Sequence, residues 1–277
     1  MAIVFGAAGE HAARKSVGAF KKIFLTLTAG IATLTLGLGS VWTLLFTENV
    51  HWLTALVGTA VFVAGAGWLT RVLERRVDKY ETERMSWRMG ALGEAEVAAE
   101  LERLSDQFTV FNNVNTKRGN LDHVVVGPTG LFAIETKNWT GLIAATDEGE
   151  LSKNGRASTA AHVRKFISRA MLMREQVIAL THSEEFYVRA VMVFPKAHVE
   201  APYGKTGKAH CVRLNRLRDY IEDPKFSAKL TTGQTDQIAR ALQGVARMDV
   251  DFAEAPTAGV TRTPSDPVMT AAAAQTV

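Results

Sequence analysis

Two long apolar runs open the chain and dominate its hydrophobic pattern. Residues 23–46 carry no charged side chain, and residues 50–70 contain His51 as their only titratable group. A helix rises about 1.5 Å per residue, so either run is long enough to cross a hydrocarbon layer about 30 Å thick. Because the runs follow one another almost directly, they predict a transmembrane α-helical hairpin over residues 23–72. A cleaved signal peptide or a buried pair of soluble helices fits this pattern less well.

Basic side chains border this hairpin on the side of both chain ends. The short connection between the runs carries Glu48 as its only full charge, whereas the outer flanks carry Arg14, Lys15, Lys21, Lys22, Arg71, Arg75, Arg76 and Lys79. By the positive-inside rule, both termini are then expected to be cytoplasmic. The sequence thus predicts an integral protein of an inner or plasma membrane, with residues 1–22 as a cytoplasmic N-terminal segment.

The pattern after the hairpin changes to alternating helical and strand periods. Residues 73–88 are expected to form a juxtamembrane helical linker that continues to about residue 104. A helix over residues 157–180 has a predicted apolar stripe of Val163, Phe166, Ile167, Ala170, Met171 and Val177. Strand patterns lie at 106–115, 121–136, 186–195 and 209–214, with further strand and turn after Gly141, and a last helix at 235–248 is expected to be capped by Thr235 or Asp236.

These elements predict an α/β domain over residues 89–252, with a central mixed sheet flanked by helices. Residues 253–277 are rich in Pro, Thr, Ala and Ser without periodicity, so they are expected to form a disordered tail. The single cysteine, Cys211, excludes an intramolecular disulfide and is expected to be an unreactive, buried thiol. The formal charge of +4 is too small to indicate a nucleic-acid partner by itself.

Candidate chemistry lies in the stretch LDHVVVGPTGLFAIETKNWTG, residues 121–141. If residues 127–130 form the turn of a β-hairpin, Asp122 lies opposite Glu135, and Lys137 points to the same face. His123 would then point to the other face, as a packing or hydrogen-bonding side chain. Two facing carboxylates repel unless a cation lies between them, and Mg²⁺ (or Mn²⁺) prefers such oxygen ligands. A surface face carrying an acid–lysine ion pair explains these three residues about equally well.

Two motifs and their order resemble the nuclease-related domain, NERD: GALGEAEVAAEL, followed by LDHVVVGPTGLFAIETKNWTG. That family is a branch of the PD-(D/E)xK endonuclease-like fold. The resemblance implies that Asp122 and Glu135 are metal ligands, that Lys137 is the catalytic lysine, and that Glu94 is an additional acidic residue holding metal or water. It also implies the Thr136 carbonyl as a further ligand. Members commonly begin the next helix with an Asn-Pro-x-x-Gln-like segment, whereas this chain reads KNGRASTAAHV.

Basic residues before and after the candidate site suggest weaker contacts to a nucleic-acid backbone: Lys117, Arg118, Arg164, Lys165 and Arg169. A solvated face, or attraction to anionic lipid, explains these residues as well. We therefore expect a membrane-anchored nuclease that hydrolyses phosphodiester bonds with Mg²⁺, with DNA as the favoured substrate. The alternative is a catalytically inactive, membrane-tethered binding or scaffold module for nucleic acid, lipid or protein.

Overall fold

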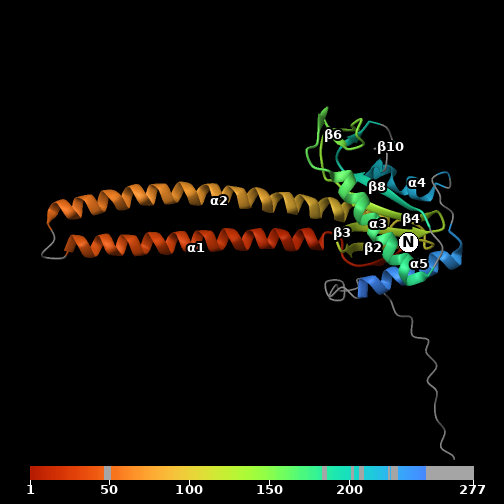
Figure 1. The fold of residues 1–277 in the computed structure, drawn as a ribbon, viewed down its shortest axis with the longest axis horizontal. Helices are drawn as coiled ribbons and strands as arrows, with labels where there is room; N and C mark the ends of the chain where they lie inside the picture. The colour runs from red at the N-terminus through yellow and green to blue at the C-terminus, as the bar shows by residue number, and fades with distance from the viewer. Residues whose placement is uncertain are drawn as a thin grey trace, which may run out of the picture.

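The computed structural model describes residues 1–46, 51–182, 186–200, 203–205, 209–223, 225 and 230–247. Two helices, α1 (Glu10–Phe46) and α2 (Trp52–Leu101), lie side by side and antiparallel and project from a globular α/β domain (Figure 1). The sheet and the remaining helices gather at the base of this hairpin. The predicted order of a helical hairpin followed by an α/β domain is therefore confirmed.

The outer parts of α1 and α2 are long and apolar enough to cross a membrane. Their large side chains point away from the protein: Phe24, Leu36 and Trp68 are 64 %, 74 % and 66 % exposed. The two helices approach closely at glycines, because a Cβ at Gly37 would lie 2.5 Å from the Phe62 ring. A helix pair with a narrow internal contact and an apolar outer surface is what a lipid-facing hairpin requires.

The charged parts of the two helices continue the pair down to the domain. Lys15 and Lys22 place their ammonium groups 5.6 Å from the rings of Trp87 and Tyr80. The predicted linker at 73–88 is thus one unbroken piece of α2, which runs from the apolar segment to the domain core.

The central sheet of the described residues has the order β1-β2-β3-β4-β8-β11-β10. Its neighbours pair in both senses: β2, β3 and β4 are antiparallel, whereas β4, β8 and β11 are parallel. The predicted mixed sheet is therefore confirmed. Its strands are β1 (Ile3–Phe5), β2 (Thr109–Thr116), β3 (Gly119–Gly127), β4 (Gly130–Thr136), β8 (Val188–Phe194), β10 (Tyr203–Lys205) and β11 (His210–Arg213).

Strand β1 is a feature that the hydrophobic pattern does not reveal. Its three residues lie beside β2 in parallel, with Phe5 opposite Phe111 and stacked on its ring at 5.2 Å. The N-terminal segment therefore belongs to the sheet, and the helical hairpin emerges between the first and second strands of the domain. Gly6 and Gly9, with φ of 80° and 73°, make the turn from β1 into α1.

Helices cover both faces of this sheet. On one face, α3 (His162–Thr181) and α5 (Thr232–Arg247) bury side chains such as Phe166 and Leu242 against Val124 and Ala133. On the other face, the C-terminal part of α2 and the short α4 (Leu217–Glu222) pack Leu101 and Tyr220 against residues such as Phe132. A 3₁₀ turn, η1 (Leu214–Arg216), precedes α4. Cys211 is buried, as expected, and burial raises the pKa of its thiol to about 12.

A second, smaller sheet of order β7-β6-β5-β9 stands beside the central one. It contains β5 (Leu142–Ala145), β6 (Leu151–Lys153), β7 (Arg156–Ala157) and β9 (His198–Val199). The expected helix start at residue 157 is wrong because Arg156 and Ala157 pair with β6, and α3 begins at His162. The apolar stripe needs one correction: Met171 is 42 % exposed, and Met173 is buried instead.

The start of α5 also differs from the expected one. Thr231 Oγ1 accepts the Gln234 N–H, and Gln234 Oε1 accepts the Thr231 N–H, which is a capping box. Thr231 therefore caps the helix one turn before Thr235 and Asp236. The predicted disordered tail at 253–277 lies outside the described residues.

Candidate metal and nucleic-acid site

The β3–β4 hairpin has the expected turn and register. Gly127 pairs with Gly130, Val126 with Leu131, and His123 with Ile134. This ladder carries Asp122 and Glu135 to its open end, on the face where Val124 and Ala133 pack beneath α3. Both carboxylates are buried, at 9 % and 4 % exposed. A charged pair at this depth is costly unless it is neutralised, so it calls for protons or cations.

Glu135 already has two cationic neighbours. Its Oε1 accepts from Lys137 Nζ at 2.7 Å and from Arg169 Nη2 at 2.9 Å. Its other carboxylate oxygen, Oε2, is buried and has no hydrogen-bond partner among the described residues. The predicted proximity of Glu135 and Lys137 is therefore present, and one carboxylate oxygen remains available for a further donor or cation.

Glu94 joins this group from α2. Burial, followed by repulsion from Glu135, raises the pKa of Glu94 to about 7. Burial, followed by repulsion from Glu135 and Glu94, raises the pKa of Asp122 well above its ordinary value. The structure thus brings Glu94, which comes from α2, to the Asp122, Glu135 and Lys137 side chains of the β3–β4 hairpin. A divalent cation would relieve the repulsion that raises these pKa values.

A cavity of about 420 Å³ opens on this group of side chains. We call it the root cavity because its walls include His11 and Ala12 of α1 and Trp87 of α2, at the root of the hairpin. Glu94, Asp122 and Glu135 face it from the domain. Neither His11 nor Trp87 was expected from the sequence. His11 lies more than a hundred positions before Asp122, and no local pattern links Trp87 to the β3–β4 hairpin.

A second hollow, of about 630 Å³, shares Glu135, Lys137 and Arg169 with the root cavity. We call it the basic groove because its lining consists mainly of cationic side chains: Arg118, Lys137, Arg164, Lys165 and Arg169, together with Glu135, His162 and Ser168. It brings together four of the five predicted nucleic-acid contacts. Lys117, the fifth, is an exposed neighbour of Arg118 in the β2–β3 turn.

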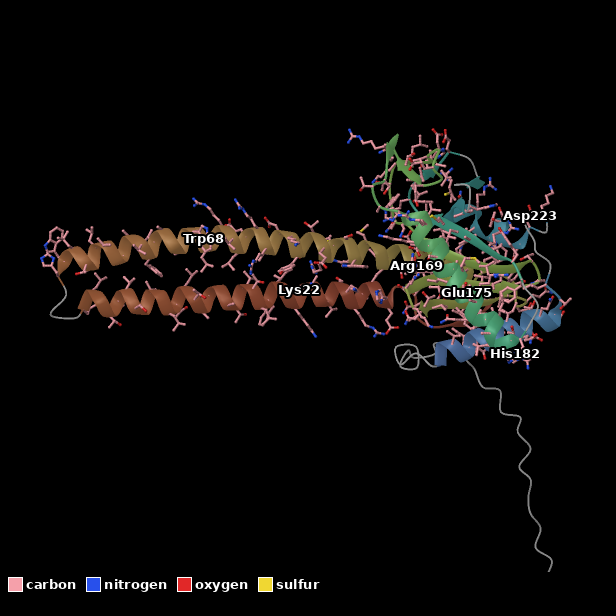
Figure 2. The ribbon with its side chains drawn as sticks, viewed as in Figure 1. Lys22, Trp68, Arg169, Glu175, His182 and Asp223 are labelled. Atoms are coloured by element: carbon pink, nitrogen blue, oxygen red, sulfur yellow. The ribbon has the colours of Figure 1, made fainter. Side chains whose placement is uncertain are left out.

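Arg169 is less exposed than the other residues predicted to contact a nucleic-acid backbone. It lies on α3 near the root of the helical hairpin, with Glu175 further along α3 and His182 just after the helix end (Figure 2). Its guanidinium bonds Glu135 and the Asn120 carbonyl, and its side chain is only 17 % exposed. Arg169 therefore holds Glu135 in place, and both residues line both hollows. Arg118 is exposed and donates to Ser168 Oγ at 2.8 Å, so it is better placed for a phosphate.

His123 lies on the opposite face of the sheet, as expected. It is fully buried, and its Nδ1 lies 2.7 Å from Asn112 Oδ1. Burial lowers its pKa to about 3, so the ring is neutral. The sequence-based interpretation of His123 as a packed, hydrogen-bonded histidine is confirmed.

The start of α3, where the sequence lacks the Pro and Gln of the Asn-Pro-x-x-Gln-like segment, is capped by a side chain from outside the helix. Ala161, the residue before the helix, offers no side-chain cap. The Glu150 carboxylate instead accepts the N–H groups of Val163 and Arg164, each at 3.0 Å. The nearby His162 lines the basic groove, and burial, aided by the charge of Lys137, lowers its pKa.

The residues fit a magnesium-type ion in part. Within the described residues, no group of three or more His, Cys, Asp and Glu side chains is arranged to hold a metal. Mg²⁺, however, is commonly held by one or two carboxylates, with water and substrate phosphates completing its shell. Asp122 and the unpartnered Oε2 of Glu135 supply such a pair of hard oxygen ligands.

A mixed sheet that presents two carboxylates and a lysine at the end of one hairpin is the arrangement expected of a nuclease-like domain. Residues 89–195 match the family model of the nuclease-related domain, NERD. The match begins in α2 just before Glu94, includes Asp122, Glu135 and Lys137, and ends after β8, so the suspected resemblance is confirmed. It does not include β1, α1 or the apolar part of α2. No curated protein and no solved structure matches the chain.

Proposed function

We propose that the protein is a membrane-anchored nuclease that hydrolyses phosphodiester bonds of nucleic acid, with DNA as the expected substrate and Mg²⁺ (or Mn²⁺) as the cofactor. The observation that carries this proposal is the convergence of Asp122, Glu135, Lys137 and Glu94 inside the nuclease-related match. These groups lie beside a groove lined by arginine and lysine. A carboxylate cluster next to a cationic groove suits a reaction between a metal-activated water and a phosphodiester.

Asp122 and Glu135 would hold the ion, with Glu94 and the Thr136 carbonyl as further oxygen donors. A bound Mg²⁺ supplies a Lewis acid for the phosphate and lowers the pKa of a water. Lys137 Nζ, 2.7 Å from Glu135, is placed to orient that water or to stabilise charge that develops on phosphorus. Arg169 keeps Glu135 in position from the α3 side.

The basic groove would bind the sugar–phosphate backbone. Arg118 and Lys165 are exposed and lie on the β2–β3 turn and on α3. Neutralising phosphates in this way releases counterions, so binding should weaken steeply with salt and depend little on sequence.

The apolar ends of α1 and α2 would form the membrane anchor, with both chain termini on the cytoplasmic side. Glu94 lies 24 residues along α2 from Thr70, which corresponds to about 36 Å of helix. The headgroup region adds only about 5 to 8 Å outside the hydrocarbon layer. The charged part of the hairpin would therefore act as a stalk that holds the site clear of the lipid surface.

A binding or scaffold module remains the alternative function. It is favoured by the two cations that already engage Glu135 and by the absent Pro and Gln at the start of α3. In that case Lys137 and Arg169 would serve to neutralise a buried carboxylate, and the groove would bind nucleic acid, lipid or protein without cleavage.

The test is a cleavage assay on the full chain in detergent micelles, because a fragment without residues 1–70 would lack β1. Supercoiled DNA, linear DNA and single-stranded RNA are each incubated with Mg²⁺, Mn²⁺ or EDTA. Asp122→Ala and Lys137→Ala should abolish cleavage, whereas the exposed control variants Asp106→Ala and Lys196→Ala should retain it. Cleavage that survives the first two variants would contradict the assigned site, and a folded but inactive wild-type protein would favour the binding module.

A further inference from the structure

The segment from Gly6 to Gly9 joins strand β1 to helix α1, and we call it the β1–α1 link. It lies outside the nuclease-related match, at the root of the helical hairpin. Two separate connections nevertheless run from this link to the carboxylates of the candidate site. They involve different faces of the sheet and different partners.

The first connection reaches Asp122 through buried polar side chains. Asn112 Nδ2 donates to the Gly6 carbonyl at 3.1 Å, and Asn112 Oδ1 lies 2.7 Å from His123 Nδ1. The other ring nitrogen of His123 lies 3.5 Å from Thr136 Oγ1. The Thr136 backbone N–H in turn donates to Asp122 Oδ2 at 2.7 Å. Asn112 and His123 are almost completely buried, so no solvent competes for these contacts.

The second connection reaches Glu94 directly. The backbone N–H of Gly9 hydrogen-bonds the Glu94 carboxylate and favours its charged form. Gly9 can approach this closely because it has no side chain: a Cβ there would lie 2.9 Å from the Ala91 carbonyl oxygen. Its φ of 73° also lies in the region that favours glycine. The Gly9 carbonyl then accepts the Ala13 N–H at 2.8 Å, which fixes the first turn of α1 to the same point.

The first turns of α1 also close the root cavity. His11 and Ala12 line it opposite Asp122 and Glu135, and Ala12 is only 3 % exposed. The wall of the cavity is therefore shared between the nuclease-related domain and a segment that precedes the apolar helices. The cavity is complete only while α1 lies against α2 at this level.

We propose that the β1–α1 link positions the carboxylate cluster, so that divalent-cation binding depends on docking of the hairpin root against the domain. Gly9 and Asn112 act as positioning residues, through Glu94 and Asp122 respectively. This proposal rests on the proposed function in that the cluster is taken to bind a divalent cation. It goes beyond that function because it makes the membrane hairpin and the preceding strand parts of the site rather than a passive anchor.

The test measures Mn²⁺ binding to the full chain in detergent, by the loss of the free-ion electron paramagnetic resonance signal. DNA cleavage is measured in parallel as a function of Mn²⁺ concentration. Gly9→Ala adds one methyl group at the link, and Gly18→Ala is the matched control, since a Cβ at Gly18 meets nothing within 4 Å. Asn112→Ala breaks the other connection. Circular dichroism confirms that each variant remains folded.

Gly9→Ala and Asn112→Ala should each weaken Mn²⁺ binding by about tenfold, the lower end of what loss of an outer-shell partner of a metal ligand costs. The Mn²⁺ concentration for half-maximal cleavage should rise by the same factor, while the KM for DNA stays constant because the basic groove is intact. Gly18→Ala should match the wild type. A merely structural role would instead lower the folded fraction without shifting the Mn²⁺ affinity of the folded protein.

The outcomes separate this proposal from the nuclease assignment. Weakened Mn²⁺ binding in the variants of a protein that cleaves nothing would support the positioning role and contradict the nuclease. Cleavage with unchanged Mn²⁺ affinity in Gly9→Ala and Asn112→Ala would overturn the positioning role alone. If Gly9→Ala does not fold, Asn112→Ala decides the question by the same affinity criterion. A wild-type chain that binds no Mn²⁺ would overturn both.

Discussion

The root cavity and the basic groove share Glu135, Lys137 and Arg169, yet the rest of their linings differ in charge. The root cavity adds carboxylates, Asp122 and Glu94, whereas the groove adds cations such as Arg118 and Lys165. Under the proposed function, the root cavity would bind the metal ion and the basic groove would bind the phosphate backbone. Glu135, with its two cationic partners, belongs to both linings.

Glu135 has two cationic partners but an unpartnered second oxygen. Oε1 faces Lys137 and Arg169, and Oε2 is buried without a partner in the described part of the chain. Without the two cations, a third buried carboxylate beside Asp122 and Glu94 would be strongly disfavoured. Lys137 and Arg169 thus stabilise the negative charge of Glu135, which the proposed function assigns to metal binding.

The largest expected effect comes from removing the charge of Glu135. Glu135→Gln keeps the size of the side chain but removes the negative charge that a metal and both cations share. Cleavage should fall by about a thousandfold or more, because several kcal/mol of metal-based stabilisation are lost and each 1.4 kcal/mol is tenfold in rate. DNA binding, measured by fluorescence anisotropy without metal, should be unchanged or tighter because Lys137 and Arg169 are released.

The exposed Glu148→Gln is the control for this change and should behave as the wild type. If Glu135→Gln lost DNA binding together with cleavage, the two hollows would not be separable in function, and the division between a metal side and a phosphate side would be wrong.

A smaller effect should follow from weakening the groove alone. Arg118→Ala combined with Lys165→Ala should raise the KM for DNA by about tenfold and lower the slope of log affinity against log salt by about 2, one unit per phosphate contact. Mn²⁺ affinity should not change. The pair Arg103→Ala and Lys196→Ala removes the same charge elsewhere and should leave both quantities constant. A change in Mn²⁺ affinity on the groove side would contradict the division.

The two sides also differ in how far the sequence predicts them. The β3–β4 hairpin is a local element, so its turn residues and alternation were sufficient to place Asp122 opposite Glu135 and to turn His123 away. The helical pattern of residues 73–104 likewise predicted a continuous helix carrying Glu94. Residues along α3 and the β2–β3 turn were recognisable as basic, and the fold brings them into one groove.

The root cavity could not be predicted because it depends on contacts across long sequence separations. Strand β1 has only three residues, too few for an alternation of apolar and polar side chains to predict a strand. Its partner β2 begins more than a hundred positions later. Whether Gly9 reaches Glu94 depends on how α1 packs on α2. The two helix starts failed for other reasons. Residues 156 and 157 pair with β6, and Glu150 caps α3 from outside the helix. The Thr231–Gln234 capping box of α5 is a local signal, but Thr235 and Asp236 offer the same kind of capping side chain.

The pH dependence offers a third test, confined to the cavity side. Because the folded-state pKa of Glu94 is raised to about 7 from an ordinary 4.5, its contribution to stability is present below pH 4.5 and lost as pH rises through 7. A divalent ion replaces the protons. The rise in melting temperature caused by Mn²⁺ should therefore be larger at pH 8 than at pH 5.5, with about 1.4 kcal/mol of binding free energy gained per pH unit for one displaced proton.

Glu94→Gln should reduce this pH dependence, and Arg118→Ala should leave it unchanged because that side chain lies in the groove. Differential scanning fluorimetry at fixed Mn²⁺ concentration measures both. A stabilisation by Mn²⁺ that is equal at the two pH values would mean that the ion does not bind at the carboxylate cluster.

The smallest expected effect concerns the wall of the groove rather than its charge. Glu150→Ala removes the carboxylate that accepts the Val163 and Arg164 N–H groups at the start of α3. Loss of a helix cap costs about 1 kcal/mol of stability. The KM for DNA should rise about two- to threefold as Arg164 and Lys165 lose their fixed positions, a change of well under 1 kcal/mol by the usual conversion. Mn²⁺ affinity should stay constant, because neither Glu150 nor the two residues that it caps line the root cavity. Chemical denaturation, with Glu148→Ala as the neighbouring control, gives the stability change. A loss of Mn²⁺ affinity in Glu150→Ala would show that the start of α3 supports the root cavity as well as the basic groove.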